Sequence, residues 1–131
     1  MKVEDVMRRE VVTVNPETTL RSAARIIFSG QVGGLPVVDK KGRLAGIVVE
    51  KDILSLFFPS LPEYIEDPTH VKDFEPMEGK VTEILELPIK KFMSKNPLTI
   101  NPQAPLLQAV SLMIANRVGR LPVVDSKKRL V

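Results

Sequence analysis

The sequence predicts a mixed α+β fold made of two similar units, each with the order strand, helix, strand, strand, helix. The main observation is an internal repeat: shifted by 86 positions, residues 3–45 align without a gap to residues 89–131, and 16 of the 43 pairs are identical. Each copy also contains an apolar pattern of helical spacing, followed by apolar segments and a turn. We therefore expect a first repeat at 1–58, an acidic, proline-rich connector at 59–88 and a second repeat at 89–131.

Each unit begins with a short strand and a helix. Val11–Val14 has the composition of a strand, and Asn15-Pro16 after it signals a turn. One face of the following helix is apolar, at Leu20, Ala23, Ala24, Ile27 and Phe28. Thr18 is a suitable N-cap for this helix. In the second copy Ala104 replaces Thr18, so we expect the second helix to begin less firmly.

The second half of the unit is a hairpin and a closing helix. Gly33-Gly34 leads into a strand at residues 35–38, and a turn at residues 39–42 joins it to a second strand at 43–49. Apolar spacing in residues 51–58 predicts a helix that Pro59 stops. The two helices can cover one face of a three-stranded sheet, and the other unit can pack against this pair.

Composition excludes several classes of function. The absence of cysteine excludes disulfides, thiolate zinc sites and cysteine nucleophiles, and the one histidine, His70, lies in a turn-like stretch where we expect it to be solvated. No apolar run approaches the ~20 residues of a membrane span, and residues 1–5 do not resemble a signal peptide. We expect a cytoplasmic protein with no catalytic residues, no metal site and no membrane segment.

The charge is unevenly distributed. The net charge is +3, but residues 59–88 hold eight acidic and two basic residues, so the rest of the chain carries +9. The basic residues are scattered and no aromatic residues are interleaved with them, which does not favour nucleic acid as a partner. Within the connector, Tyr64 and Phe74 predict local packing, and Val81–Leu87 predicts one or two helical turns.

Both repeats resemble the cystathionine-beta-synthase (CBS) domain family. The residues that carry the resemblance are Val6-Met7, Val12–Pro16, Val32–Asp39, Gly42–Val48 and Asp52, and, in the second copy, Phe92-Met93, Leu98–Pro102 and Val118–Asp125. The resemblance implies two repeats related by a pseudo-twofold axis, with a cleft on either side, and it implies a homodimer. Members commonly bind AMP, ADP, ATP or S-adenosylmethionine in these clefts and regulate an enzyme or transporter without being catalysts.

The resemblance also implies which residues hold the ligand. In the family, an aspartate at the start of the closing helix accepts hydrogen bonds from both ribose hydroxyls, and Asp52 occupies that place. The alternative is that Asp52 only caps a helix that begins near Ile53. Val49 fits the family pattern less well, because nucleotide-binding members usually carry Ser or Thr there.

The family pattern also supplies the other candidate residues. Val12 and Ile47 would pack on the adenine, Gly33 and Gly34 would permit close approach of the backbone, and Lys51 would meet a phosphate. Arg120 is the basic residue that the second half-site offers to phosphate. Each has a purely structural alternative: a core strand residue, a turn glycine or an exposed cation. Gly34 departs from the family pattern, because phosphate-holding members often carry a basic residue at this position, as Arg120 does in the second copy.

The repeat register sets one further expectation. Residues 46–58 would have counterparts at positions 132–144, beyond Val131. We expect the second repeat to lack most of its last strand, its closing helix and its own ribose aspartate, so that this half-site does not function. The sequence would then be a shortened chain or part of a longer one, with its open sheet edge covered by a partner chain.

The function that the sequence favours is a regulatory sensor of an adenosine ligand. Binding between the repeats would shift the conformation and so control a partner enzyme or transporter, which the sequence does not identify. No cofactor is required; an adenine nucleotide or S-adenosylmethionine is the expected regulatory ligand. The alternative is a ligand-free dimerisation or interaction scaffold, and a nucleic-acid binder or an enzyme is favoured less.

Overall fold

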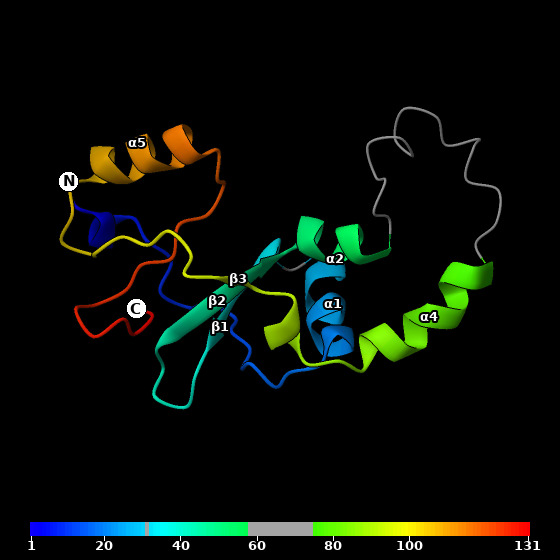
Figure 1. Ribbon diagram of the computed structural model, residues 1–131. Coiled ribbons are helices and arrows are strands. Elements are labelled where there is room, and N and C mark those ends of the chain that lie inside the picture. Colours follow the sequence, from blue (N-terminus) through cyan, green and yellow to red (C-terminus); the bar gives the residue numbers. More distant parts are fainter. Residues whose placement is uncertain (31, 58–74) are drawn as a thin grey trace.

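The computed structural model describes residues 1–30, 32–57 and 75–131, and the side chains of these residues except 75–78. It shows a mixed fold of helices and an antiparallel sheet, as the sequence predicts (Figure 1). The expectations for Tyr64, His70 and Phe74 fall outside the described residues. None of the helices in the described part combines the length and the apolarity needed to cross a membrane.

The elements follow one another in the order of two similar units joined by a helix. They are η1 (Val3–Asp5), α1 (Leu20–Phe28), β1 (Gly34–Val38), β2 (Leu44–Val49), α2 (Glu50–Phe57), α4 (Glu75–Leu85), η3 (Ile89–Lys91), β3 (Ser94–Lys95) and α5 (Leu106–Asn116). The helix α4 begins well before the one or two turns predicted at Val81–Leu87.

The sheet has the order β1-β2-β3, and its third strand comes from the second repeat. Leu35 pairs with Val48 in the antiparallel β1–β2 hairpin, and Ile47 of β2 pairs with Ser94 of β3 on the other side. The strand predicted at Val11–Val14 reduces to one bridge, between Val14 and Val37. The predicted first strand therefore keeps its place beside β1 but shrinks to a bridge, and β3 adds a strand from the second repeat on the edge of β2.

The N-cap of α1 is Thr19, one residue after the predicted N-cap Thr18. The Thr19 side chain is the N-cap and accepts a hydrogen bond from the Ser22 amide at 3.2 Å, whereas Thr18 accepts one from the Asn15 amide at 3.1 Å. The corresponding N-cap of α5 is Pro105, which offers no side-chain hydrogen bond. The second helix thus lacks a side-chain cap, as expected, but the missing group is at 105 and not at 104.

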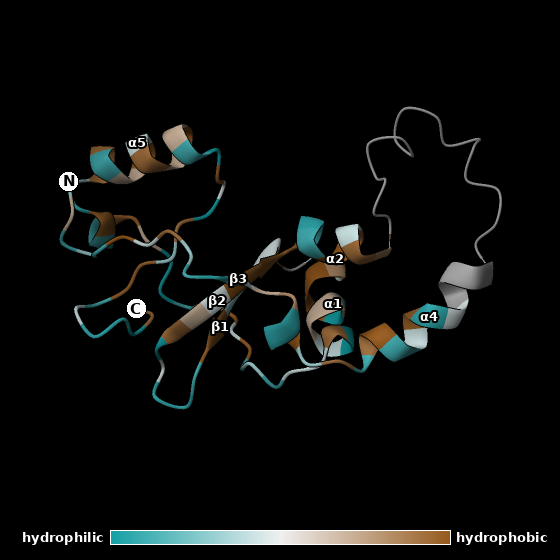
Figure 2. Ribbon diagram, in the orientation of Figure 1, coloured by the Kyte–Doolittle hydropathy of each residue, from teal (hydrophilic) through white to brown (hydrophobic). Residues whose placement is uncertain are grey.

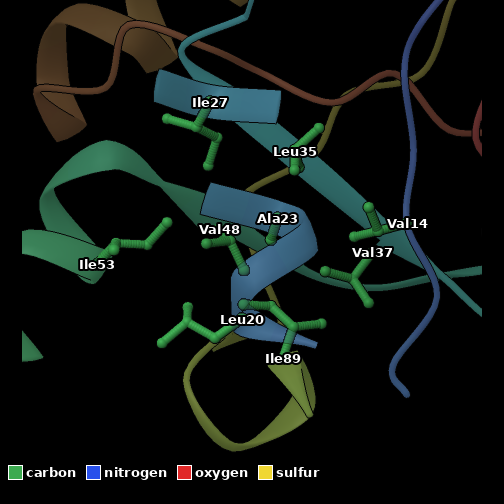
Figure 3. Packing of buried hydrophobic residues seen from close by; sticks show 9 residues of the cluster. All are labelled: Val14, Leu20, Ala23, Ile27, Leu35, Val37, Val48, Ile53 and Ile89. Atoms are coloured by element: carbon green, nitrogen blue, oxygen red, sulfur yellow. The ribbon is translucent and has the colours of Figure 1, made fainter. Parts of the chain in front are cut away.

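A core of buried apolar residues holds α1 against the hairpin. Figure 3 shows the cluster Val14, Leu20, Ala23, Ile27, Leu35, Val37, Val48, Ile53 and Ile89. Leu20, Leu35 and Ile89 are completely buried, and each such side chain contributes about 1.5–3 kcal/mol through burial. Because Ile89 lies at the start of the second repeat, the core of the first repeat depends on the second.

The dependence is reciprocal, which gives the repeat in the sequence a structural counterpart. The Ile89 amide donates to the Thr18 carbonyl at 2.7 Å, and 86 residues away the Val3 amide donates to the Ala104 carbonyl at 3.0 Å. Val3 is buried in a second cluster, with Ile100 and Ala109. Each repeat therefore begins with a segment that docks on the other one, in the pseudo-twofold arrangement.

Candidate ligand-binding cleft

A cleft of about 600 Å³ lies between the two repeats at the junction of β2 and α2. The first repeat contributes Gly33, Ile47, Val49, Glu50, Lys51, Asp52 and Leu54; the second contributes Ser94, Pro97, Leu98, Arg117, Val118, Gly119, Arg120 and Pro122. The volume is within the range of small-molecule sites, and the walls combine apolar side chains with a few charged ones. Binding there would contact both repeats at once.

Asp52 lies at the third position of α2, because the helix begins at Glu50 and not near Ile53. The Val49 amide donates to Asp52 Oδ2 at 3.0 Å, so the carboxylate reaches back and satisfies a free amide at the start of the helix. Oδ1 makes no hydrogen bond to the residues that the structure describes. One oxygen therefore caps the helix and the other is available to a ligand, so the two predicted roles of Asp52 are compatible.

Arg120 crosses from the second repeat and lies against the backbone of the glycine pair. A Cβ built on Gly33 would come within 2.7 Å of Arg120 Cζ, and one on Gly34 would lie 3.2 Å from Arg120 Cδ and 3.1 Å from Val49 Cγ1. The Gly33 carbonyl also accepts a hydrogen bond from the Glu50 amide, at 3.4 Å. The glycines thus make room for an arginine side chain, whereas the sequence prediction assigned that room to a ligand.

Five of the seven candidate residues line this cleft: Gly33, Ile47, Lys51, Asp52 and Arg120. The structure brings Arg120, which the sequence assigned to the second half-site, beside Asp52. Val12 and Gly34 instead line a second cavity, of about 640 Å³, which shares Gly33, Ile47 and Arg120 with the first. Val12 and Ile47 thus line the same second cavity, and their contact with an adenine stays a prediction.

The crossover of the chain explains which residues of the second repeat lie beside Asp52. Since β3 pairs with Gly46 and Ile47 of β2, the residues directly after β3 lie beside Asp52. One of them is Leu98, the counterpart of Val12 under the shift of 86. No pattern in the sequence indicated that this segment lies beside Asp52.

The charges of the cleft favour an anionic ligand. Lys51, Arg117 and Arg120 face two acids, Glu50 and Asp52, so the lining carries a net positive charge. The sequence analysis missed Arg117, which ends α5 in the left-handed conformation, with φ of 54°. In the described ranges 1–30, 32–57 and 75–131, no group of three or more Asp, Glu or His side chains is arranged to hold a metal ion.

Comparison with known proteins agrees with the repeat structure. The family profile described as CBS domain matches residues 3–58 and 89–131. The chain belongs to the CBS domain family. A CBS domain-containing protein of Dictyostelium discoideum is 33% identical over 130 residues, which cover 98% of this chain and 81% of that protein.

Solved CBS-pair structures share the fold. CBSX2 of Arabidopsis thaliana, solved in complex with AMP, matches with a TM-score of 0.75 and 25% identity over 99% of this chain and 86% of that one. The CBS domain pair of protein MJ0100, solved with 5′-methylthioadenosine and S-adenosyl-L-methionine, matches with a TM-score of 0.70 and 21% identity over 100% of this chain and 86% of that one. The chain is therefore a tandem CBS pair.

Proposed function

We propose that this CBS pair is a regulatory module that binds an adenosine compound in the cleft beside Asp52. The observation that carries the proposal is the meeting of Asp52, from the first repeat, and Arg120, from the second, in one cleft. AMP in CBSX2 and S-adenosylmethionine in MJ0100 show that relatives of this fold take such ligands.

Three groups of residues in the cleft would contact three parts of the ligand: the ribose, the purine and the phosphate. Asp52 Oδ1 would accept hydrogen bonds from the ribose hydroxyls, and such charge-assisted bonds contribute about 1.5–3 kcal/mol each. Ile47 and Leu98 would pack on the purine from opposite repeats. Arg120 and Arg117 would hold the phosphate or another anionic group, since guanidinium groups bind phosphate through paired donors.

Regulation would follow from the position of the ligand. A ligand held by Asp52 and Arg120 favours the arrangement of the repeats in which both reach it, and the effect on a partner is limited by the difference in affinity between the two arrangements. We propose that the controlled partner is an enzyme or a transporter, and that this chain works in the cytoplasm and performs no chemistry itself.

A second candidate function is that of a ligand-free association scaffold. Figure 2 shows apolar residues along α5, of which Leu107 is 79% and Ile114 is 73% exposed. Such a surface favours self-association into a homodimer. Val49 also supports this candidate, because its side chain cannot donate a hydrogen bond to a nucleotide.

Calorimetric titration with AMP, ATP and S-adenosylmethionine tests the proposed function. The decisive variant is Asp52→Asn, which keeps an oxygen acceptor for the Val49 amide but removes the charge; the matched control is Glu83→Gln, an exposed carboxylate on α4. We expect at least one ligand to bind, and Asp52→Asn to weaken it by about tenfold or more while Glu83→Gln does not. No binding of any of the three, together with self-association in sedimentation velocity, would support the scaffold instead.

A further inference from the structure

Two equivalent turns of the repeats lie side by side and form one surface. The turn between β1 and β2, at residues 39–43, has its counterpart at 125–129. The Leu44 amide donates to the Lys128 carbonyl at 2.9 Å, and the Leu130 amide donates to the Gly42 carbonyl at 3.1 Å. Both turns lie at the lower left of Figure 1, one after β1 and the other close to the C-terminus. We refer to residues 39–43 and 125–129 together as the paired turns.

The paired turns are strongly basic. In each turn one aspartate accepts hydrogen bonds from turn amides and pairs with the arginine four residues later: Asp39 Oδ2 with Arg43 Nε at 3.2 Å, and Asp125 Oδ2 with Arg129 Nε at 2.9 Å. Four exposed lysines remain, which make no ion pair with a carboxylate of the described residues: Lys40, Lys41, Lys127 and Lys128. The paired turns therefore carry a net charge of +4.

The backbone of Lys128 gives a second reason to assign a role to these lysines. Lys128 has φ of 63°, and the equivalent Gly42 has φ of 78°, so both occupy the left-handed region in which glycine is favoured. The second turn nevertheless holds a lysine there. The position thus carries a cation although its backbone conformation is unfavourable for a lysine. This indicates that the Lys128 side chain has a function, such as binding a partner.

We propose that the paired turns dock an acidic segment of a partner protein. Both arginines, the side chains best suited to phosphate, are already bound to aspartates, and the paired turns contain no aromatic residue on which a base could stack. Lysine ammonium groups are point charges that match single carboxylates, and four of them on two adjacent turns fit a segment that carries several carboxylates. The surface is separate from the Asp52 cleft, so the proposal does not depend on the proposed ligand.

Fluorescence anisotropy with a fluorescein-labelled oligoglutamate peptide tests this proposal at low ionic strength. The most informative variant is Lys128→Gly, which removes a charge and suits the left-handed backbone, so a loss of binding cannot be attributed to unfolding. We expect about two- to threefold weaker binding for Lys128→Gly, and at least about tenfold weaker binding when Lys40→Gln, Lys41→Gln and Lys127→Gln are added. The control, Lys91→Gln, removes an exposed lysine on η3 and should leave binding unchanged.

Three results would overturn the proposal. The first is an absence of peptide binding to the unmodified chain at low salt, where surface charges are least screened. The second is an equal loss of affinity in Lys91→Gln and in Lys128→Gly, each of which removes one positive charge, because the effect would then depend on net charge alone. The third is a DNA duplex that binds through the same lysines more tightly than the peptide, which would assign the surface to nucleic acid.

Discussion

The Arg120 side chain, from the second repeat, lies against the backbone of Gly33 in the first repeat. The contact places a cation from one repeat in the same cleft as Asp52 of the other. It also connects with α2, because the Gly33 carbonyl accepts a hydrogen bond from the Glu50 amide at the start of that helix. The absence of a side chain at Gly33 therefore allows Arg120 to occupy this position in the cleft.

Replacing Gly33 by alanine should displace Arg120. The new Cβ meets the far end of a flexible side chain, so we expect the free energy of unfolding to change by less than about 1 kcal/mol. The affinity for AMP should fall about tenfold, as it should in Arg120→Gln, while the affinity for adenosine, which has no phosphate, stays nearly constant. Calorimetric titration with both compounds measures this, and an equal loss for AMP and adenosine would contradict the assignment of Arg120 to the phosphate.

The crossover of β3 should depend on Gly46. A Cβ at this position would lie 2.7 Å from the Ser94 carbonyl oxygen and 2.7 Å from Met93 Sδ. Since the carbonyl is part of the paired strand, we expect Gly46→Ala to lower the free energy of unfolding by about 1–3 kcal/mol. Urea unfolding followed by circular dichroism measures the effect.

Gly79 is the matched control for this substitution. It lies in α4, where an added Cβ meets nothing within 4 Å, so Gly79→Ala should raise the stability by about 0.5–1 kcal/mol through helix propensity. If Gly46→Ala is as stable as Gly79→Ala, β3 does not lie beside β2 as described.

The left-handed turn positions should respond in opposite directions to substitution. Lys128→Gly should raise the free energy of unfolding by about 0.5–1 kcal/mol, because glycine adopts a positive φ without a steric penalty. Gly42→Ala should lower it by about 1 kcal/mol for the same reason. Thermal unfolding of the two variants checks this, and destabilisation by Lys128→Gly would show that the lysine contributes to folding in another way.

The two turn aspartates should make stability dependent on pH in the acid range. Hydrogen bonds from the Arg43 backbone amide to Asp39 and from the Arg129 backbone amide to Asp125 lower the pKa of each carboxyl from the ordinary value of 3.8. A pKa that folding lowers contributes stability above the unfolded value, and the contribution is lost as the pH falls through the folded value. We expect stability to fall below about pH 4.

The double variant Asp39→Asn with Asp125→Asn tests the origin of this dependence. It keeps acceptors for the turn amides but removes the titrating groups, so its unfolding free energy should fall less steeply between about pH 4 and pH 2. Urea titrations at several pH values compare the two proteins. An identical slope in both would show that other carboxyls cause the acid dependence.

Much of the fold follows from local patterns, and the site follows from them only in part. Leu20–Phe28 forms the predicted helix, because its apolar spacing is strong, and β1 and β2 lie where their apolar runs and the Asp39–Gly42 turn place them. The two-residue strand β3 has no periodicity to detect, so its crossover, and with it the place of Leu98 beside Asp52, was not predictable. The error between Thr18 and Thr19 has a simple cause, because two adjacent threonines have the same capping chemistry.

Crystal structures of the chain grown with AMP, ATP or S-adenosylmethionine would show the binding mode. We expect the compound that binds to lie in the cleft between the repeats, with its ribose hydroxyls on the Asp52 carboxylate and, for AMP or ATP, its phosphate near Arg120. An empty cleft at saturating concentrations of all three compounds, or a ligand whose ribose lies away from Asp52, would refute the proposed site.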